Sequence, residues 1–448
     1  MRRSGAGRGA VRVVGLLAGA CVVAGVLPAA AVAANPAAPA TERVSVAADG
    51  TQGNGFSGDP KLSANGRFVA FSSEATNLGP ADTNGHQDVY VKDLRTGKVD
   101  LVSVGSDGTL GDGLSGSPEI SADGRYVAFY SGAANLVPGD TNGEGDVFVH
   151  DRRTGRTVSP TAGPGKSPYG YGVQNFAISG DGQRLAFGSY RPDLVPGDTN
   201  ERLDIFVHDV QKGTTRRVSV AGDGTQTDAA SAFPSISADG RRVAFTSKAT
   251  NLTPAGPGLR RPPPQDPMYV HDLATGRTRA ASLSTTDAVV GVSPFPRLSP
   301  DGRYAVFSAV AADVVPGDTN GTYDLFARDL EQGTTRLLSR AHDGSQGDGW
   351  SSDGRLSADN RRLFFTSAAA NLVPGDTNGQ VDGFVRDLRT GRVERINVGA
   401  DGGQSASWTN IAAPDATGQL AAFDSRDDGL VPGDTNGTGD VFVRRLQH

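Results

Sequence analysis

A ten-residue pattern recurs along almost the whole of this sequence at a fixed interval. One copy, residues 120–129, reads ISADGRYVAF. The phenylalanine that ends it recurs 58 residues apart, with one interval of 62, at Phe71, Phe129, Phe187, Phe245, Phe307, Phe365 and Phe423. A period of this length marks a repeat architecture whose units stack on their neighbours. The 448 residues therefore predict one array of seven units rather than two or three unrelated domains.

Each unit contains four segments with strand character. In the second unit the first strand ends at 119–121, and Asp123-Gly124 supplies a tight hairpin turn. The strand Tyr126–Tyr130 is apolar at nearly every position, which is typical of burial on both faces. A long loop leads to a third strand, Val147–His150, and Thr154-Gly155 turns the chain into a more polar fourth strand. Four antiparallel strands per repeat, with both faces covered, predict the blade of a β-propeller.

The two ends of the array complement each other. The last unit stops after its third strand, Val441–Arg444, and a spare fourth strand lies at the other end of the chain. There, residues 43–50 read RVSVAADG and copy the fourth-strand segment 217–224, which reads RVSVAGDG. We therefore expect Val44–Val46 to pair with Val441–Val443, because closure removes exposed sheet edges. The predicted fold is all-β: a seven-bladed β-propeller of four-stranded antiparallel blades, closed by the N-terminal strand completing the last blade.

The repeated motif also carries a family resemblance. Residues 121–129, SADGRYVAF, resemble the WD-like propeller repeat of the TolB type, which also occurs in the propellers of prolyl-oligopeptidase-class enzymes. The resemblance runs from about residue 42 to the end of the chain. It implies the propeller fold but not one function, because this repeat serves many roles. The chain differs from TolB in lacking a separate N-terminal α/β domain. It differs from the peptidases in lacking a hydrolase domain and a Gly-x-Ser-x-Gly elbow.

The N-terminal segment predicts export. Four arginines precede an apolar stretch, Val13–Leu27, and Ala31-Val32-Ala33 fits a small-x-small cleavage site. We assign residues 1–33 to a signal peptide, 34–41 to a linker and 42–448 to the propeller. The apolar stretch is short for a membrane anchor. The expected location is extracellular, or a periplasm-like envelope space, with no membrane span after cleavage.

Cleavage would change the composition of the mature protein. It removes Cys21, the only cysteine, and with it any disulfide or thiolate metal site. Loss of the four arginines lowers the formal net charge by four, from −6 to −10. An acidic protein is a poor partner for nucleic acid, whose binding depends on cationic contacts to phosphate. The mature protein is expected to be a monomer.

Six units carry an Asp-Thr-Asn loop between their second and third strands. In a propeller these loops share one face, here called the loop face, with the segments that join blades, and the tight turns occupy the opposite turn face. Each loop places an Asp, an Asn two residues on and a second Asp after six residues. The members are Asp82, Asn84 and Asp88; Asp140, Asn142 and Asp146; Asp198, Asn200 and Asp204; Asp318, Asn320 and Asp324; Asp376, Asn378 and Asp382; and Asp434, Asn436 and Asp440. The spacing is similar to the later part of a calcium loop, so Ca²⁺ is a candidate cofactor. The alternative is an Asx turn at the first Asp, with the second Asp tying the loop down.

Two further features mark candidate ligand-binding residues. Trp350, Trp408 and Phe56 share one position ahead of the first strand in the last two units and the first, which ring closure makes neighbours. They predict either an aromatic platform near the channel mouth or an inter-blade packing position. The fourth unit replaces its Asp-Thr-Asn loop by a proline-rich loop with Arg260 and Arg261, which suit an acidic ligand. The alternative is a loop that merely lengthened.

The chain shows no catalytic constellation. His150, His208 and His271 occupy one repeat position, where other units carry Lys92, Arg328, Arg386 and Arg444. A position that accepts lysine and arginine indicates a solvated strand end rather than a metal ligand or a base. The predicted function is a non-catalytic binding or scaffold module for a protein or a cell-envelope polysaccharide. The alternative is an extracellular carbohydrate-active enzyme, a lyase or a glycosidase, with carboxylates at the channel mouth.

Overall fold

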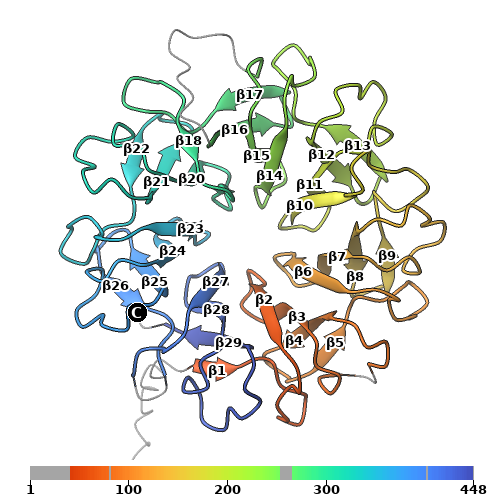
Figure 1. Ribbon diagram of the computed structural model, residues 1–448, viewed down its shortest axis with the longest axis horizontal. Coiled ribbons are helices and arrows are strands. Elements are labelled where there is room, and N and C mark those ends of the chain that lie inside the picture. Colours follow the sequence, from red (N-terminus) through yellow and green to blue (C-terminus); the bar gives the residue numbers. More distant parts are fainter. Residues whose placement is uncertain (1–40, 80–81, 253–264, 400–401, 447–448) are drawn as a thin grey trace, which may run out of the picture. The chain divides into compact units, whose positions relative to one another are not determined.

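The computed structural model describes residues 41–79, 82–252, 265–399 and 402–446. The strands of these residues gather into seven sheets around a common axis (Figure 1). Neighbouring strands in each sheet are antiparallel. The expected all-β, seven-bladed propeller is therefore confirmed. None of the described residues forms a helix long and apolar enough to cross a membrane.

Each blade has four strands, counted from the axis outward, and blade seven borrows its fourth from the N-terminal end. The innermost strands of blades one to seven are β2 (Ser57–Leu62), β6 (Ser115–Ile120), β10 (Val173–Ile178), β14 (Ser231–Ile236), β19 (Arg297–Leu298), β23 (Ser351–Leu356) and β27 (Thr409–Pro414). The second strands are β3 (Phe68–Ser73), β7 (Tyr126–Ser131), β11 (Arg184–Ser189), β15 (Arg242–Ser247), β20 (Tyr304–Ala309), β24 (Arg362–Ser367) and β28 (Leu420–Ser425). The third strands are β4 (Asp88–Asp93), β8 (Asp146–Asp151), β12 (Asp204–Asp209), β16 (Asp266–Asp272), β21 (Asp324–Asp329), β25 (Asp382–Asp387) and β29 (Asp440–Arg445). The outer strands are β5 (Val99–Leu101), β9 (Arg156–Val158), β13 (Thr214–Arg217), β17 (Arg277–Ala280), β22 (Thr335–Leu337), β26 (Val393–Arg395) and β1 (Thr41–Arg43), and a short strand, β18 (Gly291–Val292), pairs with β16.

Strand β1 closes the ring by completing the sheet of β27, β28 and β29 (Figure 1). Its register places Thr41 opposite Arg444 and Arg43 opposite Phe442, and the Val44 N–H donates to the Val441 carbonyl at 2.7 Å. Closure by the N-terminal strand is therefore confirmed.

The bounds of the closing strand correct the sequence expectation. The ladder is formed by Thr41–Arg43 rather than Val44–Val46, and its first residue belongs to the segment assigned to the linker. The chain bends directly after the ladder, because Val46 pairs with Gln52 in a local bridge. The buried Val44 lies at that bend.

The core lies between blades and is built on one aromatic pair per blade. The repeated phenylalanine of the second strand stacks on an aromatic residue of the third strand, as Phe129 does on Phe148 at a centroid distance of 5.7 Å. Both rings are fully buried. The apolar sequence of the second strand predicts burial on both faces. This is confirmed for the middle of β7, residues Val127 to Phe129. Closely packed aromatic residues of this size dominate the free energy of folding in such cores.

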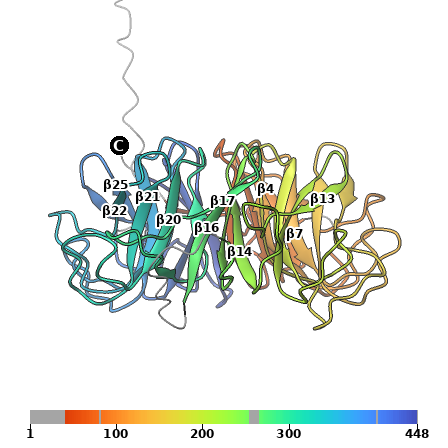
Figure 2. The ribbon, with the colours of Figure 1, turned by 90° about the horizontal axis from the view of Figure 1, so that it is seen from above.

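The turn face narrows to a ring of small residues. The residue before each Asp-Gly turn, or its equivalent, lines a cavity on the axis: Ala64, Ala122, Gly180, Ala238, Pro300, Ala358 and Ala416. Backbone hydrogen bonds link neighbouring turns around this ring, for example Ala122 N–H to Gly180 O at 2.7 Å and Gly180 N–H to Ala238 O at 2.9 Å. Pro300 has no N–H and cannot donate to the next blade. The side view shows the turn face and the loop face as the two rims of the ring (Figure 2).

Candidate functional site

Each Asp-Thr-Asn loop is held by its asparagine. The Asn84 side-chain oxygen accepts from the His86 N–H at 2.9 Å, and its Nδ2 donates to Asp88 at 2.8 Å. The oxygen of the equivalent asparagine accepts from the N–H two residues on in the other five loops as well. The Asx turn expected at the first Asp is present in blade one, where Asp82 Oδ1 accepts from the Asn84 N–H at 3.4 Å, and a second turn of the same kind forms at the Asn. The second Asp does tie the loop down, since it begins the third strand and is fully buried.

Arginines stand between the two carboxylates in three of the six loops. Arg395, on β26, places Nη2 2.9 Å from Asp376 and Nε 3.2 Å from Asp382. Arg217 in blade three and Arg43 in blade seven make the equivalent pairs, at 3.3 to 3.8 Å. Sequence reasoning missed these arginines, although Arg43 begins the segment that copies the one beginning at Arg217. In the described residues no group of three or more acidic, histidine or cysteine side chains is arranged to hold a metal ion. Calcium in these loops stays a prediction.

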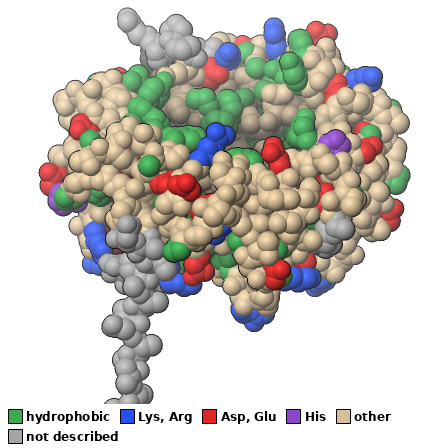
Figure 3. Space-filling model, turned by 60° about the horizontal axis from the view of Figure 1, so that its bottom comes forward, with side chains coloured by type: hydrophobic (Ala, Val, Ile, Leu, Met, Phe, Trp, Pro, Cys, Tyr) green, Lys and Arg blue, Asp and Glu red, His purple; other side chains and the backbone are tan. Residues whose placement is uncertain are grey.

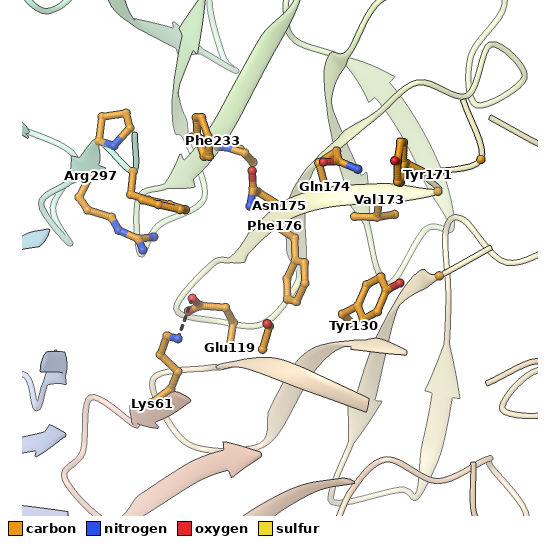
Figure 4. Close-up of a pocket in the computed structure, with 17 residues that line it drawn as sticks. Lys61, Glu119, Tyr130, Tyr171, Val173, Gln174, Asn175, Phe176, Phe233 and Arg297 are labelled. Carbon is orange, nitrogen blue, oxygen red and sulfur yellow. Dashed lines mark ion pairs between the residues drawn. The ribbon is translucent and has the colours of Figure 1, made fainter. Parts of the chain in front are cut away.

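The mouth of the axial channel on the loop face holds a cavity of about 350 Å³. Its wall combines aromatic side chains with amides and charges from blades one to five, as Figure 4 shows for Tyr130, Tyr171, Phe176, Gln174 and Asn175. A second cavity, of about 270 Å³, lies among the inner strands and the small residues of the turn face. The volume of the mouth cavity lies at the lower end of the range for small-ligand pockets.

Bulges in the inner strands shape this mouth. The register of the first two strands shifts by a residue in six blades. Five non-glycine residues at one equivalent repeat position, which lies in the bulge of blades one, two, four and six, have φ between 51° and 69°: Asp59, Ser117, Phe233, Phe295 and Asp353. A left-handed backbone conformation is energetically costly at a non-glycine residue, and such residues are frequent at functional sites. Bulges change the direction in which side chains point. Here Phe233 and Phe295 meet edge to face at 4.8 Å on the cavity wall.

The charges of the channel come from one position of the inner strand, at which the repeats differ. Blades one to six carry Lys61, Glu119, Ala177, Ser235, Arg297 and Arg355 there. Lys61 and Glu119, on the inner strands of the neighbouring blades one and two, form an ion pair at 3.6 Å at one edge of the cavity (Figure 4). Arg297 and Arg355 have no carboxylate within 4.0 Å among the described residues, and the buried Nε of Arg355 has no hydrogen-bond partner there. Burial, together with the neighbouring Arg297, lowers the pKa of Arg355 to about 10.

The aromatic candidates separate into two environments. Trp350 and Trp408 are 37% and 50% exposed, which is more than an inter-blade packing position would leave. Phe56 is partly buried, covers Gly58 and Gly439, and lies 6.0 Å from the Arg426 guanidinium. Ligand binding by Phe56, Trp350 and Trp408 stays a prediction. Arg260 and Arg261 lie outside the described residues.

The large apolar side chains that stay exposed in the described residues all lie on the loop face. They precede or begin inner strands, or follow a second strand: Leu114, Tyr169, Tyr171, Phe295, Val310, Trp350 and Trp408. Figure 3 shows hydrophobic side chains around the hollow on this side of the ring, with charged side chains beside it. Sequence reasoning found only the two tryptophans of this set. The position of Leu114 was visible in the sequence, whereas no sequence pattern marked Phe295 as exposed.

The repeat position with histidine is buried, which contradicts the expected solvated strand end. His150, His208 and His271 are 6%, 7% and 4% exposed. The ring Nδ1 of His271 lies 2.9 Å from the Thr278 hydroxyl, which donates to the Val220 carbonyl of the preceding blade. Lys92 reaches the preceding blade directly, donating to the Val46 carbonyl at 2.7 Å. The position accepts lysine, arginine or histidine because each can link neighbouring blades.

This burial predicts a loss of stability in mild acid. Burial lowers the pKa of His271 to about 4, from an ordinary value of 6.5. As the pH falls below 6.5 the unfolded chain takes up the proton first, so the free energy of unfolding decreases until the pH reaches about 4. Between pH 7 and pH 4.5 the His271→Gln variant is expected to lose about 2 kcal/mol less than the wild type in urea unfolding. His342→Gln, in an exposed loop, serves as the control, and an unchanged pH dependence in His271→Gln would contradict this assignment.

These features define a class of protein: a closed seven-bladed β-propeller with an open, asymmetric cavity on its loop face. No protein-family model matches the chain, and no curated protein matches it. Solved structures show the same fold. The β-propeller domain of the trilobed protease from Pyrococcus furiosus is 12% identical, with a TM-score of 0.53 over 88% of this chain and 94% of that one. Oligogalacturonate lyase from Vibrio parahaemolyticus is 12% identical, with a TM-score of 0.53 over 91% and 94%.

TolB from Acinetobacter baumannii is also similar, at 15% identity and a TM-score of 0.38, with 89% of this chain and 82% of that one covered. The two likenesses with a TM-score of 0.53 show the propeller fold alone, and this fold serves both enzymes and other proteins.

Proposed function

We propose that this chain is a secreted, non-catalytic binding module whose loop face docks a protein partner and receives an acidic segment of that partner in the channel. The observation that carries the proposal is the coincidence of two features on one face. The exposed apolar side chains surround a mouth, and the channel behind it contains arginines that have no carboxylate within 4.0 Å among the residues that the structure describes. Exposed apolar patches with a polar centre are typical of interaction surfaces.

A protein partner fits the apolar residues better than a polysaccharide does. Leu114 and Val310 are aliphatic, and they lie on different blades from Trp408. A sugar chain would stack on aromatic rings but would gain little from isolated aliphatic side chains. Protein interfaces bury a broad face with aromatic anchors at its centre. The face therefore matches the size and chemistry of a protein surface.

The charge of the channel favours an acidic segment. The chain as a whole has a formal net charge of −6. Arg297 and Arg355 are thus a local positive centre in an acidic protein, and Arg297 lines both channel cavities. A carboxylate between two guanidinium groups forms strong, charge-assisted hydrogen bonds. The surrounding negative charge would repel acidic partners from other surfaces, which favours specificity for the channel.

The cavity wall supports binding rather than glycoside hydrolysis. Canonical glycosidases place two carboxyl groups on either side of the scissile bond. Among the described residues that line the mouth cavity, Glu119 is the only carboxylate, and it is already paired with Lys61. We propose accordingly that the module is not an enzyme. A calcium ion in the Asp-Thr-Asn loops would stabilise the loop face without contacting the ligand.

Export is part of the same proposal, because an envelope or extracellular partner would meet the module there. It rests on the signal-peptide pattern of residues 1–33, which lie outside the described residues. N-terminal sequencing of the protein recovered from culture medium would test it, and an intact Met1 would contradict it.

The binding proposal is tested with three baits and a defined probe. The wild-type module, the double variant Arg297→Ala/Arg355→Ala and the Trp408→Ala variant are used to capture envelope proteins, and the affinity of the purified partner is measured. We expect the double variant to bind at least tenfold more weakly, because a charge-assisted pair is worth about 1.5–3 kcal/mol. Trp408→Ala is expected to lose affinity by a similar factor.

Arg361→Ala supplies the matched control, because Arg361 is an exposed arginine on the turn face. A tetraglutamate peptide serves as the minimal probe and should bind the wild type but not the double variant, with an affinity that falls as salt is added. Binding of an acidic polysaccharide but no protein, with the same dependence on the arginines, would assign a polysaccharide ligand instead. Equal capture by the wild type and the double variant would refute the channel site.

A further inference from the structure

The six Asp-Thr-Asn loops pose the same electrostatic problem. Each brings two aspartates into the protein, and the second of each pair is completely buried. The first is 7% exposed at Asp82, 9% at Asp140 and 6% at Asp318. Buried charges are costly unless they are paired and hydrogen-bonded. The way in which each blade offsets these two charges can therefore be compared from repeat to repeat.

Blades three, six and seven supply a guanidinium from the outer strand. In blade six, Asp376 Oδ2 is the atom closest to Arg395, at 2.9 Å, and in blade seven Asp434 Oδ2 lies 3.3 Å from Arg43. At this outer-strand position the other three loops have Leu101, Ser159 and Leu337. Those three blades need another source of positive charge or of hydrogen bonds.

Blades one and two have such a source. In blade one the Tyr90 hydroxyl donates to Asp82 Oδ2 at 2.8 Å. In blade two the buried Arg191, which follows β11 of the next blade, acts electrostatically on both Asp140 and Asp146. Burial still raises the pKa of Asp140 to about 6, against the effect of Arg191.

Blade five has neither. Phe326 replaces Tyr90, Leu337 replaces the outer-strand arginine, and Ala369 stands at the position of Arg191. Asp318 Oδ2 is buried and has no hydrogen-bond partner or cation within 4.0 Å among the described residues. The equivalent atoms in blades six and seven, Asp376 Oδ2 and Asp434 Oδ2, form ion pairs with a guanidinium.

The remaining contacts of blade five do not neutralise its two carboxylates. Gln346 Nε2 donates to Asp318 Oδ1 and to Asp324 Oδ2, each at 2.7 Å. Asn320 Nδ2 also donates to Asp324 Oδ2, at 2.8 Å. The Ser339 hydroxyl donates to Asp324 Oδ1 at 2.5 Å. All of these donors are neutral, so the two negative charges have no counter-charge within 4.0 Å in the part of the chain that the structure describes. Burial accordingly raises the pKa of Asp324.

We propose that blade five binds a calcium ion between Asp318 and Asp324, at the place where blades three, six and seven hold a guanidinium. Ca²⁺ takes oxygen ligands from carboxylates, amides and water in flexible geometry, whereas Mg²⁺ demands a near-octahedral set. Asp318 Oδ2 is free to bind the ion, and Asp324 provides the second charge. Rotation of the Gln346 amide would present its oxygen instead of its nitrogen, and water completes the coordination. The site is independent of the proposed partner and narrows the general calcium prediction to one loop.

Calorimetric titration of the chelator-treated full-length protein with CaCl₂ tests this proposal. We expect one bound Ca²⁺ per chain and a higher melting temperature with Ca²⁺ than with chelator, by linkage. Leu337→Arg, which gives blade five the residue of blades three and six, should abolish both effects. Asp318→Asn should also abolish them without adding bulk, which keeps the test valid if Leu337→Arg folds poorly.

Asp82→Asn provides the matched control, since it changes the equivalent aspartate of blade one and should leave one Ca²⁺ bound. Absence of saturable Ca²⁺ binding by the wild type would overturn the proposal. So would binding that survives both Leu337→Arg and Asp318→Asn, or binding that is lost in Asp82→Asn.

Discussion

Removal of residues 1–49 is expected to cost this protein more than about 5 kcal/mol of stability, which is comparable with the whole free energy of unfolding of many domains. The truncation deletes β1 and leaves β29 as an open sheet edge. It removes Arg43 from the buried Asp434 and Asp440, and breaking such a pair costs about 3–5 kcal/mol. It also removes the buried side chain of Val44, which adds about 1.5–3 kcal/mol. Urea unfolding and size-exclusion chromatography should show an unfolded or aggregated chain.

A circular permutant separates the loss of β1 from the loss of the N-terminal segment. In it, residues 41–54 follow His448 through a Thr-Gly turn like the one at Thr390-Gly391, which joins β25 to β26. The permutant supplies the same strand to the same edge from the other end of the chain. Its stability is expected to match that of the full-length protein. A truncated chain as stable as the wild type, or a permutant as unstable as the truncation, would show that β1 is dispensable.

Much of the fold could be predicted because the same pattern of strands and turns occurs seven times in the sequence. The 58-residue period gave the number of blades, and the Asp-Gly turns gave the hairpins. The exact position of the closing strand could not be predicted in the same way. In blade three the ladder of β13 also ends at Arg217, before the copied valine. Val44 and Val218 are buried at the edge of the core and do not belong to the strand ladders. The apolar pattern therefore placed the closing strand three residues too far toward the C-terminus.

The candidate site was less predictable because it depends on contacts between distant repeats. The Asp-Thr-Asn loops are visible as a motif, but the arginine that pairs with Asp376 lies 19 residues later on another strand. The positive φ of Phe295 is a backbone conformation that no short motif marks. The buried histidines were misjudged because a position shared with lysine and arginine looks solvated, although Lys92 uses its charge inside the ring to reach a backbone carbonyl.

Replacement of Arg395 by methionine is expected to cost about 3–5 kcal/mol, because it leaves two buried carboxylates without their counter-charge. Arg395 is 7% exposed, and the side chains of Asp376 and Asp382 are 6% and 0% exposed. Methionine keeps most of the volume of the side chain, so the cost is electrostatic rather than a cavity effect. Burial already raises the pKa of Asp376 even with Arg395 beside it, and loss of the arginine should raise it further.

The electrostatic cause can be tested by removing one of the two negative charges that Arg395 neutralises. Asp376→Asn in the Arg395→Met background should recover a large part of the lost stability in urea unfolding at pH 7, because only one buried carboxylate then remains. The penalty of Arg395→Met alone should also shrink as the pH is lowered from 7 to 5, since the native state with a raised carboxyl pKa takes up the proton first. A penalty that is the same at both pH values, and that persists after Asp376→Asn, would mean that Arg395 acts through packing. In that case the guanidinium would not be the counter-charge of the loop, and the comparison between blades six and five would lose its basis.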